Sequence, residues 1–254
     1  MNSEEIYSRY SELIRKNNNI EPEMFVKYNV KRGLRNNDGT GVLVGLTEVG
    51  DVHAYIMDEN EKVPVEGRLR YRGIDLFDLV KGFQDENRLG FEECVYLLLF
   101  GELPNKKELD KFCELLDSKR KLPRAFTEDM ILKAPSKDIM NKLARAVLAS
   151  YSYDPNPDDT SVENTLRQCI ELIARFPAMA AYGYQAKSHY HDGKSLFLHS
   201  PKEGASTAEN ILHMIRPDCS YTRSEVEILD LLLVLHAEHG GGNNSTFATR
   251  VVSS

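Results

Sequence analysis

The sequence predicts a mainly α-helical protein with many helices and one small β element near the N-terminus. Two observations carry this prediction. From Ile74 onward the apolar residues recur at helical spacing, whereas segments with strand-like alternation are confined to the first third of the chain. The 254 residues, of which 41% are hydrophobic, are enough for a buried core in one or two domains.

The composition disfavours several kinds of partner. With 32 Lys and Arg against 39 Asp and Glu, the formal charge is −7, so nothing attracts the chain generally to nucleic acid or anionic lipid. The longest apolar stretch, Ile228–Leu235, is interrupted by Asp230 and is far shorter than the ~20 residues that span a bilayer. The N-terminus lacks the pattern of a signal peptide. We therefore expect a soluble, cytoplasmic protein without a nucleic-acid or membrane partner.

The four cysteines stand far apart and form no CxxC pair, which favours reduced, buried thiols over disulfides or a zinc site. They are Cys94, Cys113, Cys169 and Cys219.

The N-terminal part contains one predicted helix and the β element. Residues 4–16 place their apolar side chains on one stripe. The glycine-rich residues 39–47 and the segment Val52–Ile56 predict a hairpin that turns at Gly50-Asp51. Residues 68–72 alternate Arg with Leu or Tyr, as a strand does, and Gly73 ends them. These three arginines could bind phosphate, but ion pairing or solvation at a strand edge is the simpler interpretation.

The rest of the chain predicts helices in succession, punctuated by caps, glycine and proline. Gly101 and Pro104 end one helix, and Asn105 with Glu108 caps the next. Pro177 should kink or split a long helix, and the small residues 178–183 after it would let another helix approach closely. The predicted helices are Asp75–Lys81, 91–99, one after Asn105, Ser136–Ser150, 161–185 and Ser206–Arg216, followed by Glu225–His239 with a Ser224/Glu227 capping box; residues 154–159 form a loop.

The candidate site lies at the end of the last of these helices. His239 follows Leu235, Leu232 and Ile228 at helical spacing, so it continues what we interpret as a buried stripe, and His236 lies one turn earlier. Three glycines then end the helix, and Asn243 or Ser245 can cap a new helix that runs through Arg250. Two imidazoles and a helix N-terminus favour an anionic ligand such as a carboxylate.

Two other interpretations of this segment remain open. A histidine at the buried end of an apolar helix is often a core residue rather than a ligand. A metal site is less favoured, because His236 and His239 are three residues apart rather than four and no other helix offers a Glu-x-x-His pattern. We expect no metal.

The order of motifs resembles that of the citrate synthase family. His236-Ala-Glu-His239 followed by Asn243-Asn-Ser245 matches the family pattern His-[Ser/Ala]-[Asp/Glu]-His, three residues, Asn-x-Ser. Further segments match in order, so that the resemblance runs from about Leu43 to Ser254: Leu69–Asp75, Phe91–Pro104, Ser150–Asp154, Phe197–His199, Ala208–Asn210 and Leu212–Pro217.

The resemblance implies a mostly helical homodimer with a large and a small domain. Such an enzyme is an acyltransferase that condenses acetyl-CoA with oxaloacetate to citrate and CoA, at the start of the tricarboxylic acid cycle. Acetyl-CoA is then a substrate, and no cofactor is implied. Carried over residue by residue, His239 matches a histidine that contacts oxaloacetate, and Asn243 and Ser245 match residues near the catalytic histidine. His236 is interpreted as structural support.

The family's remaining functional motifs lie downstream of the matched region. These are a Gly-Pro-x-His-Gly-Gly-Ala-Asn segment, a Gly-[Phe/Tyr]-Gly-His segment, the catalytic aspartate and the carboxylate-binding arginines. We therefore expect residues 1–38 to be an N-terminal helix and lead-in, and residues 39–254 to be the first part of the large domain, without the small domain. We expect no catalytic residue in this chain, which should be inactive by itself. The alternatives are a 2-methylcitrate synthase, which accepts propionyl-CoA, and a non-catalytic helical dimerisation fragment.

Overall fold

A computed structural model describes residues 21–27, 47–59, 61–241 and 243–253. The chain divides into two compact units, one made of Met1–Leu46 with Gly241–Ser254 and the other of Thr47–Gly240. The predicted helix over residues 4–16 and the glycine-rich residues 39–46 lie outside the described residues. The domain boundary predicted after residue 38 stays a prediction.

The first unit contains two described helices, α2 (Pro22–Lys27) and α10 (Asn244–Ser253). The side-chain oxygen of Asn243 accepts hydrogen bonds from the backbone N–H of Ser245 at 2.8 Å and of Thr246 at 3.4 Å. This cap satisfies donors that the first turn of a helix leaves unpaired, and it places the start of α10 where the sequence predicts it.

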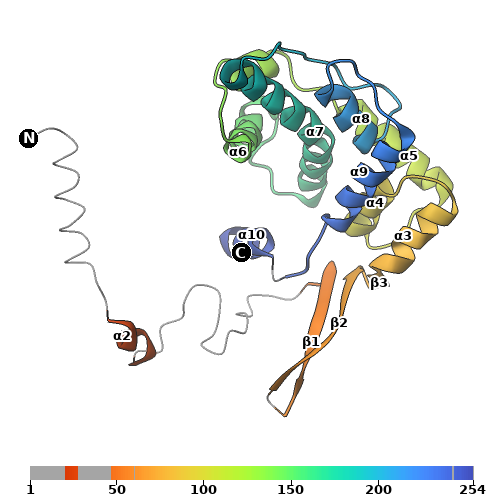
Figure 1. Ribbon diagram of the computed structural model, residues 1–254, viewed down its shortest axis with the longest axis vertical. Helices are drawn as coiled ribbons and strands as arrows, with labels where there is room; N and C mark the ends of the chain where they lie inside the picture. The colour runs from red at the N-terminus through yellow and green to blue at the C-terminus, as the bar shows by residue number, and fades with distance from the viewer. Residues whose placement is uncertain (1–20, 28–46, 60, 242, 254) are drawn as a thin grey trace, which may run out of the picture. The chain divides into compact units, whose positions relative to one another are not determined.

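The second unit is mainly helical with one small sheet at its N-terminal end, which confirms the predicted fold class (Figure 1). The longest helix, α7, contacts α5, α6, α8 and a short π-helix, η1. The elements in order are β1 (Gly50–Asp58), β2 (Glu61–Tyr71), β3 (Ile74–Asp75), α3 (Leu76–Asp85), α4 (Phe91–Phe100), α5 (Lys106–Lys119), η1 (Thr127–Leu132), α6 (Ile139–Ser150), η2 (Tyr151–Tyr153), α7 (Val162–Asp192), α8 (Thr207–Ile215) and α9 (Arg223–Leu235).

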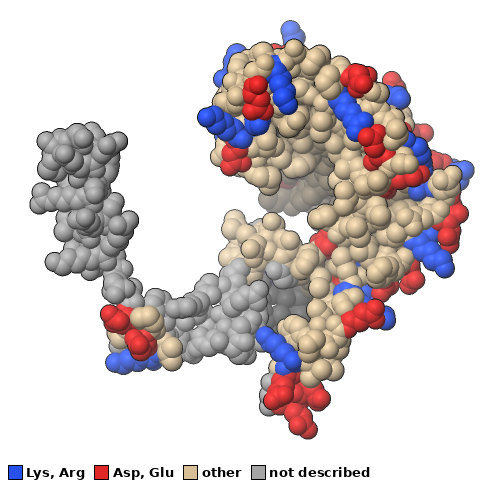
Figure 2. Space-filling view, in the orientation of Figure 1, with Lys and Arg blue, Asp and Glu red and all other residues tan. Residues whose placement is uncertain are grey.

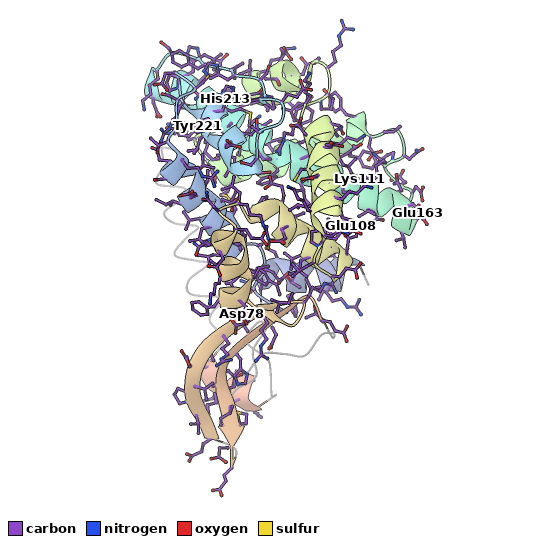
Figure 3. The ribbon with its side chains drawn as sticks, turned by 90° about the vertical axis from the view of Figure 1, so that its right-hand side faces the viewer. Asp78, Glu108, Lys111, Glu163, His213 and Tyr221 are labelled. Carbon is purple, nitrogen blue, oxygen red and sulfur yellow. The ribbon has the colours of Figure 1, made fainter. Side chains whose placement is uncertain are left out.

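A hairpin forms, but its arms are not the predicted ones, and residues 39–46 of the predicted first arm lie outside the described residues. Gly50 and Asp51 begin β1 and pair with Tyr71 and Arg70 of β2, whereas the chain reverses after Asp58. The predicted turn was wrong because these two residues pair within a strand, and the observed tip contains a left-handed residue, Glu59 with φ of 45°. The hairpin extends beyond Asp78 of α3 (Figure 3), and acidic side chains gather at its free end (Figure 2).

The three arginines of this region have partners within the chain. Arg72 donates two hydrogen bonds, of 2.8 and 3.2 Å, to the carbonyl oxygen of Leu98 near the end of α4. Arg68 and Arg70 form ion pairs with carboxylates of the sheet, Arg68–Asp75 at 4.0 Å and Arg70–Asp51 at 3.6 Å. The interpretation as ion pairs therefore holds for Arg68 and Arg70. Arg72 instead donates to a carbonyl oxygen near the end of α4.

Some helix caps follow the sequence and others do not. The helix predicted from Ser136 begins at Ile139 and is capped by Asp138. Asn105 and Glu108 form the predicted capping box of α5. The cap of α9, however, is formed by Thr222 with Glu225 and not by Ser224 with Glu227. Both pairs have the spacing of a capping box, but Thr222 has the extended backbone that a capping residue needs, whereas Ser224 lies inside the helix.

The helix α7 runs through Pro177 without splitting, contrary to one of the predicted outcomes. Proline removes one hydrogen bond of the helical ladder, and burial on both sides of this position holds the helix together. The small residues after Pro177 pack inside the same chain: Ala178 and Ala181 are buried, and a Cβ on Gly183 would lie 3.3 Å from Cγ of Lys142.

Three clusters of buried side chains form the core of this unit. The cluster between α7, α6 and η1 is the largest. Its members are Phe126, Ile131, Leu143, Ala146, Ala178, Met179, Ala181, Tyr182, Ala186 and Met214. A second joins the sheet to α3, α4 and α9 through Tyr71, Leu79, Phe83, Cys94, Leu97 and Val234, and a third joins α4, α5 and α7 through Val95, Phe112, Leu116, Ile170 and Ala174. All four cysteines are free thiols; Cys94 is buried, whereas Cys113, Cys169 and Cys219 are half-buried, so the expectation of buried thiols holds for Cys94 alone.

Two helices begin at carboxylates that belong to other helices. Asp230 of α9 is 1% exposed and accepts hydrogen bonds from the backbone N–H of Gly90 at 2.7 Å and of Phe91 at 3.3 Å, where α4 starts. Glu92 of α4 in turn accepts the backbone N–H of Thr207 at 2.7 Å, where α8 starts. These contacts fix α4, α8 and α9 against one another.

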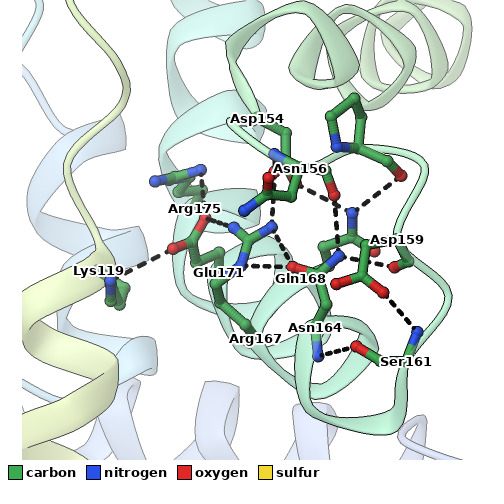
Figure 4. Close-up of polar contacts among 11 residues, drawn as sticks. Lys119, Asp154, Asn156, Asp159, Ser161, Asn164, Arg167, Gln168, Glu171 and Arg175 are labelled. Atoms are coloured by element: carbon green, nitrogen blue, oxygen red, sulfur yellow. Dashed lines mark hydrogen bonds and ion pairs between the residues drawn. The ribbon is translucent and has the colours of Figure 1, made fainter.

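The predicted loop over residues 154–159 is held by side chains of α7 (Figure 4). Asn164 donates to the carbonyl oxygens of Asn156 at 2.9 Å and Asp159 at 2.7 Å, and Arg167 donates to the carboxylate of Asp154 at 2.6 Å. The loop therefore has a fixed conformation. Across the described ranges of the chain, no helix combines the length and apolar character needed to cross a membrane.

Candidate functional site

The helix that carries the candidate histidines ends at Leu235, four residues before the predicted end. In a continuing helix the N–H of Glu238 would bond to the carbonyl oxygen of Val234. Instead the hydroxyl of Tyr71 lies between them: it donates to Val234 at 2.8 Å and accepts the N–H of Glu238 at 3.3 Å. A buried side chain from β2 thus ends α9, and residues 236–240 form a turn.

The stripe that leads to His239 is exposed rather than buried, which corrects the prediction. Its side chains are 62% (Ile228), 45% (Leu232) and 40% (Leu235) exposed. The buried face of α9 carries Val226, Asp230 and Val234 instead, because Asp230 must reach the start of α4.

The imidazole of His239 is accessible. The residue is exposed, and its ring makes no hydrogen bond to any residue that the structure describes. His239 is therefore not a satisfied core residue. His236 is also exposed, but its Nδ1 lies 2.8 Å from the carbonyl oxygen of Leu232, so its ring is bonded back to the helix end.

The backbone around His239 is held by the residue before it. One carboxylate oxygen of Glu238, Oε1, accepts the N–H of His239 at 2.8 Å and the N–H of Gly240 at 2.7 Å. Two backbone donors share this anionic acceptor, and hydrogen bonds to charged groups are stronger than those between neutral groups.

Two glycines allow β1 to approach this turn. A Cβ on Gly50 would lie 2.5 Å from Cγ of Glu238, and a Cβ on Gly240 would lie 3.0 Å from the carbonyl oxygen of Gly50. Gly240 also has φ of 72°, in the left-handed region that favours glycine. Any other residue at either position would push the strand and the turn apart.

A cavity of about 610 Å³ borders Gly50 on the strand side of this turn. Backbone of the loops and polar side chains line it. The lining residues are Thr47, Glu48, Gly50, Asp51, Arg70, Arg72, Gly73 and Gly101.

Of the side chains in this turn, the imidazole of His239 is exposed and makes no hydrogen bond to a described residue. Burial raises the pKa of Tyr71 to about 12, so the hydroxyl stays neutral and keeps its hydrogen-bonding role. The Oε1 atom of Glu238 is occupied by backbone donors. His239 can therefore donate one hydrogen bond or one proton to an oxygen of a bound carboxylate or carbonyl. Over the described part of the chain, His, Cys, Asp and Glu side chains form no group of three able to hold a metal ion.

Asn243 and Ser245 belong to the other compact unit, where Asn243 caps α10. Their predicted convergence with His239 on one ligand stays a prediction. Sequence reasoning missed Tyr71, Glu238 and Gly50 as parts of this turn. The available signal was the acidic residue between two histidines, beside a glycine break.

Comparison with known proteins identifies relatives of one family. The family model described as "Citrate synthase, C-terminal domain" matches residues 38–254. A 2-methylcitrate synthase of Mycobacterium tuberculosis is 28% identical over 234 residues, which cover 92% of this chain and 51% of that protein. A citrate synthase of Corynebacterium glutamicum is 33% identical over 195 residues, which cover 74% of this chain and 41% of that protein.

Solved structures agree with these matches. The crystal structure of citrate synthase from Pyrobaculum aerophilum superposes with a TM-score of 0.67 at 27% identity, covering 84% of this chain and 49% of that one. The chain thus spans about half the length of the relatives it matches. With most of its length matched by the family model and its helices superposing on a solved member, the chain belongs to the citrate synthase family.

Proposed function

We propose that this chain is part of a citrate synthase, which condenses acetyl-CoA with oxaloacetate and releases citrate and CoA. The observation that carries the proposal is the imidazole of His239, which is exposed, makes no hydrogen bond to a described residue and stands on a backbone fixed by Glu238. The family resemblance matches this residue to a histidine that contacts oxaloacetate. In the proposed reaction, the acetyl methyl carbon loses a proton to a base and forms a bond to the carbonyl carbon of oxaloacetate. His239 donates to oxaloacetate oxygen, and water then hydrolyses the thioester.

The proposed enzyme includes more chain than these 254 residues. The relatives are about twice as long, and the exposed apolar side chains of Ile228, Leu232 and Leu235 form a stripe beside His239. Exposed apolar stripes of this kind mark surfaces that further protein covers. We propose that the catalytic aspartate, the catalytic histidine and the carboxylate-binding arginines lie in that further chain, as the family resemblance implies.

The replacement His239→Ala in the longer protein tests the proposed role. Loss of a hydrogen bond to a charged group costs roughly 1.5–3 kcal/mol, so the KM for oxaloacetate should rise about ten- to a hundredfold, more than the KM for acetyl-CoA. His236→Ala is the matched control, because it removes an exposed histidine whose ring is bonded to its own helix. A lowered melting temperature with an unchanged oxaloacetate KM would assign His239 to packing and refute the role.

A second test concerns the 254-residue chain alone. Because proton abstraction from a thioester needs a base and an acid acting together, we propose that this chain releases no CoA above background from acetyl-CoA and oxaloacetate. A thiol-release assay that showed turnover like that of the longer protein would require a different catalytic assignment.

A 2-methylcitrate synthase is the second candidate. The Mycobacterium tuberculosis relative with that name aligns over 92% of this chain, more than the citrate synthase of Corynebacterium glutamicum does. The ratio of kcat/KM for propionyl-CoA to that for acetyl-CoA in the longer protein decides between the two: a ratio above one favours 2-methylcitrate.

A further inference from the structure

The turn that carries His239 is closed by two side chains, whereas short turns are commonly closed by backbone alone. The hydroxyl of Tyr71 holds the peptide before it, through Val234 and the N–H of Glu238. The carboxylate of Glu238 then holds the two N–H groups on either side of the α-carbon of His239. With both flanking peptide units tied to one oxygen atom, the backbone angles of His239 have little freedom, and so does the direction of its Cα–Cβ bond.

The side chain of Glu238 is itself confined. Its Cγ lies 2.5 Å from where a Cβ on Gly50 would be, so the carboxylate arm occupies the space that this glycine leaves free. The hydroxyl of Tyr71 also lies 3.2 Å from the carbonyl oxygen of Glu238. The residue is thus held by β1 on one side and by Tyr71 on the other.

These contacts suit Glu238 to orientation. Its Oε1 atom is directed at the backbone on both sides of the α-carbon of His239. Substrate-binding groups are effective only when neighbouring contacts hold them in position.

We propose that Glu238 is a positioning residue, which acts through its two backbone hydrogen bonds to hold the imidazole of His239 in the orientation that binds the substrate carboxylate. Tyr71 and Gly50 support it by fixing the turn and making room for the carboxylate arm. This proposal rests on the proposed function for its substrate and on the geometry of the turn for its mechanism.

The first arm of the test measures the turn without reference to activity. Backbone amide exchange of His239 and Gly240 is followed by NMR in the 254-residue chain and its variants. In Glu238→Ala both amides should exchange roughly tenfold faster or more, since each loses one hydrogen bond to a charged group. In Glu238→Gln the amide oxygen remains an acceptor, so exchange should stay within about threefold of the parent. Unchanged exchange in Glu238→Ala would overturn the proposal.

The second arm measures substrate binding in the longer protein. Glu238→Ala should raise the KM for oxaloacetate roughly tenfold and leave the KM for acyl-CoA within about twofold, and Glu238→Gln should restore most of the loss. Glu227→Ala, which removes an exposed glutamate from α9, is the control and should change neither constant.

The two arms together distinguish a positioning role of Glu238 from a need for its charge and from a purely structural role. If Glu238→Gln is as impaired as Glu238→Ala while its amides stay protected, the charge of Glu238 rather than its hydrogen bonds is required, and the positioning role is wrong. If Glu238→Ala loses amide protection but keeps both KM values, the turn is structural only. If the parent protein has no condensing activity but the amide pattern is as expected, the proposed function fails while the closed turn stands, and the positioning of a substrate ligand is withdrawn.

Discussion

Gly50 and Gly240 face each other backbone to backbone, 190 positions apart in the chain: a Cβ on Gly240 would lie 3.0 Å from the carbonyl oxygen of Gly50. The contact joins the first residue of β1 to the turn that follows α9. It requires glycine at both positions for different reasons, since Gly50 leaves room for Glu238 and Gly240 has a positive φ.

Alanine at either glycine should therefore destabilise the larger unit. We expect Gly50→Ala and Gly240→Ala each to lower the free energy of unfolding by about 1–3 kcal/mol, from displaced packing in the first and backbone strain in the second. Urea unfolding measures the change. Gly67→Ala is the control, because Gly67 lies in β2, has nothing within 4 Å of its Cβ position and should change stability by less than about 0.5 kcal/mol. Equal losses at all three positions would contradict the close contact.

The buried carboxylate of Asp230 should make stability depend on pH. Burial raises its pKa to about 6 from the ordinary 3.8, and the charge of Glu92 adds to the effect. Between these pH values the folded state binds more protons than the unfolded state, so stability falls as the pH rises from 4 to 6, by up to about 3 kcal/mol. The variant Asp230→Asn cannot ionise. Relative to it, the free energy of unfolding of the parent should fall as the pH rises from 4 to 6. A difference that stays flat with pH would show that Asp230 has its ordinary pKa when folded.

Asp230→Ala separates the cap from the charge. Both variants lack the charge, but only Asn keeps an oxygen that can accept from Gly90 or Phe91. At pH 4, Asp230→Ala should be less stable than Asp230→Asn by about 1 kcal/mol, the usual worth of a helix cap.

Replacement of the buried Lys142 should destabilise the protein, because a carbonyl oxygen that the ammonium now satisfies would lose its donor. Its ammonium donates to the carbonyl oxygens of Met130 and Ala134, beside the end of the π-helix, and is 1% exposed. Lys142→Met leaves the Met130 carbonyl unpaired and should lower the free energy of unfolding by about 1–3 kcal/mol at pH 7. Thermal unfolding measures this, with the exposed Lys133→Met as a control that should change little.

The pH dependence of the Lys142 variant has a definite sign. Burial lowers the pKa of Lys142, so the folded state releases the proton at a lower pH than the unfolded state does. Relative to Lys142→Met, the parent should gain stability as the pH rises from the lowered pKa toward 10.5. A relative loss in that range would mean that the ammonium is favourably paired.

We expect the chain to form a homodimer, as the family resemblance implies, but not through the small residues 178–183. The small residues 178–183 are occupied by the chain's own core, whereas Met140 and Leu148 of α6 are 74% and 76% exposed. Light scattering at tens of micromolar should give a dimeric mass, and Met140→Gln with Leu148→Gln should lower it. A monomeric mass for the parent chain refutes the dimer.

The elements that could be predicted from the sequence are those whose ends are set locally. Gly101 ends α4 in the left-handed conformation, and Asn105 with Glu108 caps α5, because each of these contacts spans no more than four residues. The end of α9 could not be predicted in this way. It depends on Tyr71, whose hydroxyl interrupts a helical hydrogen bond 163 residues further along the chain.

The buried face of α9 escaped prediction for a related reason. Periodicity assigns apolar residues to the core and Asp230 to the surface, but Asp230 is buried to serve the start of α4, and Ile228 and Leu232 are exposed. The motif therefore singled out His239, while its position beyond the helix, its exposure and its fixed backbone required the three-dimensional contacts.

The position of Asp230 in the chain also determines when the cap of α4 can form during translation. The start of α4 leaves the ribosome 140 residues before the side chain that caps it. At roughly 5–20 residues per second, that interval is roughly 7–28 s. During this time the α4 segment exists in the nascent chain without its cap, and α8, whose first N–H is capped by Glu92 of α4, is made in the same interval. The cap of Glu92 on α8 needs only residues up to Thr207, whereas the cap of Asp230 on α4 can form only after the helix that carries Asp230 has emerged.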